Sequence, residues 1–294
     1  MIRAKFAMIG ICALAVLSGA PRAADAATAL RNGQIDIVYG EPQNPAFLPI
    51  YEGLKSRKAL EELRAFLAPL QLPKRITIEV KQCGAQDSPR QPDGPATICY
   101  EYVARLIELA AAIPADGAAP NGLTRSEAVF GAFVQAALTR TASVVYDALD
   151  VPIWGREPDA ADRLAAFLML QFGPKAARKL MDGATFFFNA SDRSWTGVDF
   201  SDADSTQSQR YYNFQCMAFG GDPKLFGDFD GSTRKQGRGD RSNRMPILSG
   251  GRAVRCEKEY REALYAFQTL ILPHVDRVLM REVLARDWLA PFDE

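Results

Sequence analysis

The sequence predicts an α+β fold, with a small mixed sheet and helices in the N-terminal part and a mostly helical C-terminal half. Two observations support this prediction. Segments that alternate between apolar and polar residues, the pattern of half-buried strands, all lie within the first hundred residues. Apolar residues spaced three and four apart, the pattern of amphipathic helices, dominate from residue 124 onward. Strands that come early and helices that come late favour α+β over alternating α/β units.

Three strands are expected in the N-terminal part. Residues 34–39 and 75–80 alternate with period two, and residues 96–100 form a third candidate after a turn-rich stretch. Between the first two strands, residues 51–67 carry apolar positions at helical spacing, so they should form one amphipathic helix. A further helix should follow the third strand and reach Ala112.

A long helix should open the C-terminal half. Thr124-x-x-Glu127 matches a capping box, and apolar residues recur at i, i+3 or i+4 and i+7 up to about Asp150. A second helix should begin near Pro158, because proline is favoured in the first helical turn, and end before Gly173. Further helices are expected at 175–181, at 206–216 and, with a break at Pro273, at 251–288.

Residues 1–26 have the features of a signal peptide. Two basic residues precede an apolar run, Phe6–Leu17, that is too short to span a bilayer comfortably, and Ala24-Asp25-Ala26 offers a small-residue cleavage site. A retained N-terminal anchor is the alternative. We therefore expect residues 27–294 to be exported to the periplasm or secreted, with no membrane span after signal cleavage.

The size and charge of the mature chain limit its architecture and its partners. Its 294 − 26 = 268 residues can bury a substantial core and fit one domain, with a possible lobe boundary in a loop near 114–123. Removing the signal peptide leaves 35 − 3 = 32 basic and 35 − 1 = 34 acidic residues, a net charge of −2. This balance provides no overall field that would attract nucleic acid.

Four cysteines remain after signal cleavage: Cys83, Cys99, Cys216 and Cys256. An even number in an exported chain suits two disulfides, for which three connectivities exist. We favour Cys83–Cys99 and Cys216–Cys256, because each pair joins neighbouring segments. A four-cysteine zinc site is the alternative, but no Cys-x₂₋₄-Cys spacing supports it.

One motif follows the long helix: Gly155-Arg156-Glu157-Pro158-Asp159-Ala160-Ala161-Asp162. It occurs together with Cys99-Tyr100-Glu101, with Gln209–Cys216 followed by Gly221-Asp222-Pro223, and with Arg255–Tyr260. In this order and spacing the chain resembles a bacterial family of zincin-like metallopeptidases, catalogued as domain of unknown function 4344. The resemblance covers most of the mature chain. It implies a zincin-like fold, a single metallopeptidase-like domain over 27–294, and zinc as the family's cofactor.

The residues at the positions of the family's zinc site are not zinc ligands here. The resemblance places the two histidines of an HExxH motif on Thr139 and Ser143, the catalytic glutamate on Arg140, and the third ligand on Pro158. The whole chain has one histidine, His274, which is more typical of a helix end or a core position. We therefore expect no zinc, no other cofactor and no catalytic residues.

Carboxylates close to this motif offer a second possibility. Asp147, Glu157, Asp159 and Asp162 carry the oxygen ligands that Ca²⁺, Mg²⁺ or Mn²⁺ prefer. The alternative is an acidic helix start, which the helix dipole favours. We also expect Arg140 to supply a positive charge in the cleft by pairing with Asp162, Asp159 or Glu157, a solvent-facing Arg140 being the alternative.

Three hypotheses for function follow. The first is an exported pseudopeptidase that keeps the family fold, has lost zinc and catalysis, and binds a peptide or protein partner. The second is an active hydrolase with an atypical carboxylate metal site, and the third is a structural periplasmic protein.

Overall fold

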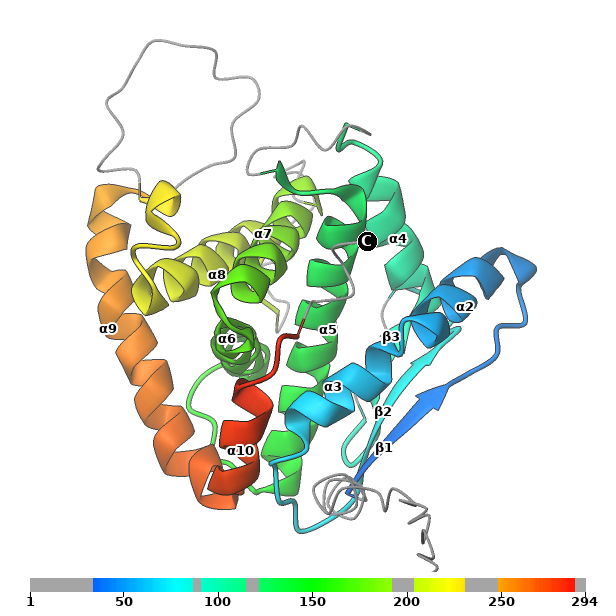
Figure 1. The fold of residues 1–294 in the computed structure, drawn as a ribbon, viewed down its shortest axis with the longest axis horizontal. Helices are drawn as coiled ribbons and strands as arrows, with labels where there is room; N and C mark the ends of the chain where they lie inside the picture. Colours follow the sequence, from blue (N-terminus) through cyan, green and yellow to red (C-terminus); the bar gives the residue numbers. More distant parts are fainter. Residues whose placement is uncertain (1–33, 87–90, 115–121, 192–203, 231–247, 289–294) are drawn as a thin grey trace, which may run out of the picture.

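The computed structural model describes residues 34–86, 91–114, 122–191, 204–230 and 248–288, and confirms the α+β fold. Figure 1 shows a small sheet on one side of the molecule and a larger group of helices on the other. The predicted signal peptide lies outside the described residues, and so does most of the predicted lobe boundary near 114–123.

The sheet has three strands in the order β1-β2-β3. Both pairs are parallel, with Ile35 opposite Ile76 and Ile78 opposite Ala96. The expected strands are present, but the sheet is parallel rather than mixed. The reason is that both connections are long enough to return the chain to the same end of the sheet, the first of them through two helices. The strands are β1 (Ile35–Tyr39), β2 (Ile76–Lys81) and β3 (Ala96–Cys99).

Two helices, α2 (Leu48–Ser56) and α3 (Ala59–Leu67), replace the single helix expected over 51–67. The chain breaks at Lys58, whose backbone is left-handed with φ 51°. The Tyr39 hydroxyl then joins α3 to β1, because it accepts from Leu60 N (2.8 Å) and donates to Glu61 (2.7 Å).

The helical half contains most of the remaining elements. Both predicted capping boxes are confirmed, at Thr124 with Glu127 and at Thr206 with Gln209. The helix expected at 175–181 extends to Ser191, and the one expected to end at Cys216 extends to Gly221. The α-helices that follow the sheet are α4 (Tyr100–Ala110), α5 (Arg125–Ala148), α6 (Glu157–Met169), α7 (Pro174–Ser191), α8 (Gln207–Gly221), α9 (Gly250–Ala266) and α10 (Arg277–Leu284).

The central helix is α5, which lies between the sheet and the other long helices (Figure 1). Its length and hydropathy would suit a membrane span, but most of it is buried inside the protein, as in a core helix. It crosses α7 closely at two glycines. A Cβ on Gly131 would lie 2.8 Å from the Leu180 carbonyl oxygen, and one on Gly183 would lie 2.9 Å from that of Ala128. Side chains larger than hydrogen would therefore separate these two helices.

The C-terminal segment returns to the N-terminal part of the fold. A π-helical stretch, Phe267–Ile271, and a 3₁₀ turn, Leu272–His274, connect α9 to α10. An isolated antiparallel bridge then pairs Val275 with Leu70. Two backbone hydrogen bonds flank the bridge, from Gln71 N to His274 O (2.7 Å) and from Asp276 N to Pro69 O (2.8 Å).

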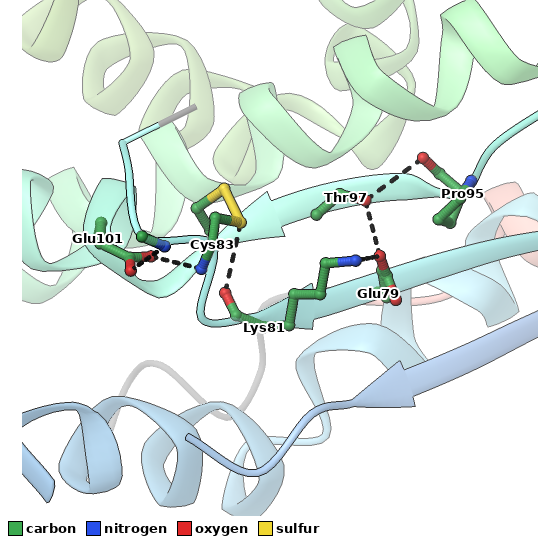
Figure 2. Close-up of a disulfide and its surroundings, with 8 residues drawn as sticks. Glu79, Lys81, Cys83, Pro95, Thr97 and Glu101 are labelled. Carbon is green, nitrogen blue, oxygen red and sulfur yellow. Dashed lines mark hydrogen bonds and ion pairs between the residues drawn. A yellow bond between two sulfur atoms is a disulfide. The ribbon is translucent and has the colours of Figure 1, made fainter. Parts of the chain in front are cut away.

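Both predicted disulfides are confirmed. Cys83–Cys99 links the end of β2 to the end of β3, and Figure 2 shows the Glu101 carboxylate beside it, accepting from the backbone N–H groups of Cys83 (3.0 Å) and Gly84 (2.7 Å). Cys216–Cys256 joins α8 to α9.

Candidate functional site

The site is built on one face of α5 and the start of α6. Thr139, Ser143 and Tyr146 follow each other at spacings of four and three, so they share a helix face. That face lies against α6, because Thr139 Oγ1 donates to Asp162 (2.8 Å) and the Tyr146 hydroxyl donates to the Ala160 carbonyl (2.9 Å). Thr139 and Ser143, the positions that the resemblance assigns to two histidines, therefore lie on the face of α5 that meets α6.

Asp162 is the centre of a buried hydrogen-bond network. Arg210 of α8 donates from Nε to Oδ2 (2.6 Å) and from Nη2 to Oδ1 (2.9 Å). Oδ1 also accepts from Thr139 and from Gln135 Nε2 (3.2 Å). Two parallel N–H···O bonds from one guanidinium form the strong bidentate arrangement of an arginine–carboxylate pair.

The pair is largely removed from water. The side chain of Asp162 is 9% exposed and that of Arg210 is 21% exposed. The guanidinium also lies 4.6 Å from the centre of the Phe188 ring, within cation–π distance. Burial opposes the charge on Arg210, but the adjacent Asp162 carboxylate outweighs it and raises the pKa of the guanidinium. Arg210 therefore keeps its positive charge across the ordinary pH range.

The capping box of α8 places Arg210 in this network. Thr206 and Gln209 begin the helix, and Tyr211 and Phe214, which follow Arg210, are buried in the core. The sequence analysis included Arg210 only within the segment Gln209–Cys216 and did not predict it as a site residue. No sequence signal relates Arg210 to Asp162, because the two residues are 48 positions apart.

Asp162 accepts from the guanidinium of Arg210, a partner that the sequence analysis did not predict. The pairing of Arg140 with Asp162, Asp159 or Glu157 stays a prediction. Arg140, Glu157 and Asp159 are half-buried. Burial raises the pKa of Tyr146, and the nearby charge of Glu157 raises it further.

The donor set at this site does not fit zinc. Thr139 and Ser143 offer neutral hydroxyls in place of imidazoles, and Pro158 has no side-chain donor atom. Asp162 already has a permanent cation on both of its oxygens. Its carboxylate is therefore already engaged in an ion pair and is not a free metal ligand.

The other candidate ligands do not form an alternative site in the described part of the chain. There, Cys83, Cys99 and Glu101 are the group of three potential ligands whose donor atoms converge, and both sulfurs belong to a disulfide. The carboxylates of Asp147, Glu157, Asp159 and Asp162 form no such group.

His274 lies beside the C-terminal end of α5. It is exposed, and its neighbours are Ala148, Leu149 and Asp150, beside the C-terminal end of the helix. Ala148 follows Thr139 by more than two helical turns, about 13 Å along the axis. The single imidazole of the chain is therefore placed away from the Asp162 network.

Comparison with known proteins places the chain in a family. No curated protein and no solved structure matches it. A family model does match, over residues 39–271, which is more than half of the 294 residues and includes α5, α6 and α8. The chain belongs to the family DUF4344, whose description is "Putative metallopeptidase".

Proposed function

We propose that this member of the metallopeptidase family is an exported pseudopeptidase, which binds a peptide or protein without zinc and without hydrolysing it. The observation that carries the proposal is the Asp162 network. Asp162 is bound on both oxygens by Arg210, and Thr139 donates to it from a position that the family would use for a histidine.

Peptidase chemistry of this type requires two imidazoles and a carboxylate on the metal, and a free carboxylate as general base. The corresponding residues here are Thr139, Ser143, Pro158 and Arg140. None of them can ligate zinc strongly or accept a proton from water near neutral pH. Export is supported by the two disulfides, which form and persist in oxidising compartments.

Metal analysis of the purified protein is the first test. We expect zinc at less than about one-tenth of an equivalent per protein molecule. EDTA should leave the melting temperature unchanged, because only the removal of a bound metal would lower the stability. Stoichiometric zinc, or proteolysis of casein that 1,10-phenanthroline inhibits, would overturn the proposal.

Restoring the ligands is the second test. The variant Thr139→His, Arg140→Glu, Ser143→His, Pro158→Glu should gain zinc and hydrolyse casein. The matched control carries the same three ligands but Arg140→Gln, so it should bind zinc and remain inactive. If the restored variant folds but binds no zinc, these positions are not a former metal site.

Peptide binding is measured separately, by fluorescence polarisation of labelled casein fragments. The wild-type protein should bind fragments and leave them intact over hours. We expect a dissociation constant below about 1 mM, which corresponds to a binding free energy of about −4 kcal/mol or stronger. Complete absence of binding at that concentration would favour a structural protein instead.

A further inference from the structure

A cavity of about 280 Å³ lies inside the helical half, apart from the Asp162 network. Its walls come mainly from α3, α5, α6, the π-helical stretch and α10. The walls are almost entirely apolar. Among the side chains that line them are Leu138 of α5, Phe167 of α6, Ile271 of the π-helical stretch and Val283 of α10.

The polar side chains on the wall do not require a polar ligand. Thr141 Oγ1 donates to the Ala137 carbonyl (2.7 Å), and Gln171 Nε2 donates to the Phe167 carbonyl (3.0 Å). Gln268 is exposed at the rim of the cavity. The interior therefore favours a ligand that carries no charge and forms no hydrogen bonds there.

The cavity is separate from the site described above. On α5 it contacts Leu138, Ala142 and Val145, whereas Thr139 and Ser143 face α6 about a quarter-turn further round the helix. An occupant of the cavity would therefore contact a different face of α5 from the one that carries the Asp162 network.

The void contrasts with the packing elsewhere on the same helix. Where α5 crosses α7, only glycine fits at Gly131 and Gly183. Protein interiors seldom contain voids larger than a water molecule. The wall also contains the π-helical stretch Phe267–Ile271, and such irregular turns occur frequently at functional sites. An apolar pocket of this size, open to solvent at its rim, points to a ligand.

We propose that this cavity binds the hydrocarbon chain of a single-chain amphiphile such as a fatty acid. A cavity of about 150 Å³ holds benzene, so this one has room for on the order of ten carbon atoms. An aliphatic chain can adapt to a wall made from five elements. The exposed rim at Gln268 and Leu284 lets the polar headgroup remain in water.

Solution NMR with methyl-labelled methionine tests the location directly. Met280 of α10 lines the cavity, and Met217 of α8 is buried elsewhere in the core. Decanoate should shift the Met280 methyl resonance and leave that of Met217 unchanged. Equal shifts at both methyls, or none up to 1 mM decanoate (roughly the weakest affinity of interest), would overturn the proposal.

Chain length and a filling variant test the chemistry. Affinity should rise about fourfold per methylene from butyrate to decanoate, as expected for burial of apolar chain. Ala142→Met should fill the cavity and weaken decanoate binding at least about tenfold, whereas Ala266→Met, the same change at an exposed position of α9, should alter it less than about twofold. An unchanged affinity in Ala142→Met would refute the assignment. If that variant does not fold, the Met280 shift decides.

Discussion

Breaking the Asp162–Arg210 pair should destabilise the protein strongly. Arg210→Met removes the guanidinium and keeps most of the apolar stem, so Oδ2 of Asp162 loses its donor while Oδ1 keeps Thr139 and Gln135. Breaking a buried pair from one side costs about 3–5 kcal/mol. Because Arg210 is 21% exposed, we expect the lower end, about 3 kcal/mol. Asp162→Asn should cost a similar amount, since it leaves the guanidinium buried without its counter-charge.

A double-mutant cycle in urea measures the pair itself. The double variant should cost about 3 kcal/mol rather than the sum of about 6, which gives a coupling energy of about 3 kcal/mol. The matched control is Arg105–Glu108 on α4, an exposed pair (42% and 66%) whose cycle should give less than about 0.5 kcal/mol. Additive single effects below about 1 kcal/mol at Arg210 and Asp162 would refute the inference that this network is a buried structural charge pair.

Three further predictions concern other parts of the fold. Gly220→Ala should lower the free energy of unfolding by about 2–3 kcal/mol in urea, because its Cβ would lie 2.2 Å from the Cys256 carbonyl oxygen. The control Gly53→Ala, in open space on α2, should stabilise the protein by about 0.5–1 kcal/mol. Equal effects would contradict the close approach of α8 and α9. Burial opposes the charge on Glu127, but its hydrogen bonds, above all from Lys179, lower the pKa of the carboxyl below its ordinary 4.5. The ionised Glu127 therefore stabilises the folded protein above that pH, and this stabilisation is lost as the pH falls further. The unfolding free energy should fall less steeply between pH 7 and pH 3 in Glu127→Gln than in the wild type, and identical slopes would exclude this linkage. Reduction should lower the free energy of unfolding by about 3 kcal/mol for Cys83–Cys99, with a separation of 16 residues, and by about 4 kcal/mol for Cys216–Cys256, with a separation of 40. Denaturation with and without reductant measures this loss. Free thiols found by mass spectrometry without reductant would contradict the pairing.

Local patterns predicted the elements that local forces determine. The alternation at 34–39 and 75–80 located two strands, and the capping boxes at Thr124 and Thr206 located two helix starts, because each signal lies within a few residues of the structure it determines. The break at Lys58 was missed, since a lysine with positive φ has no sequence signal comparable to glycine.

Long-range pairing accounts for most of what the sequence did not predict. Parallel pairing of the strands depends on how their connections fold, and the sequence pattern of a short strand is the same in a mixed sheet. Arg210 and Asp162 are 48 residues apart, and no periodicity relates them. The disulfides could be assigned because their partners are near in sequence, whereas the cavity depends on five elements from both ends of the chain.

The bridge between Leu70 and Val275 also constrains the order in which the molecule can fold. Leu70 belongs to the first third of the chain and Val275 to its last twenty residues, and the segment that follows Val275 places Trp288 against Phe66 and Phe172. On the ribosome, a nascent chain that has completed its sheet and α3 still lacks this cover. The apolar face of α3 therefore stays open until Val275 and Trp288 have been synthesised. Chains that stop short of Val275 should be captured by chaperones or proteases rather than accumulate as a stable shorter domain.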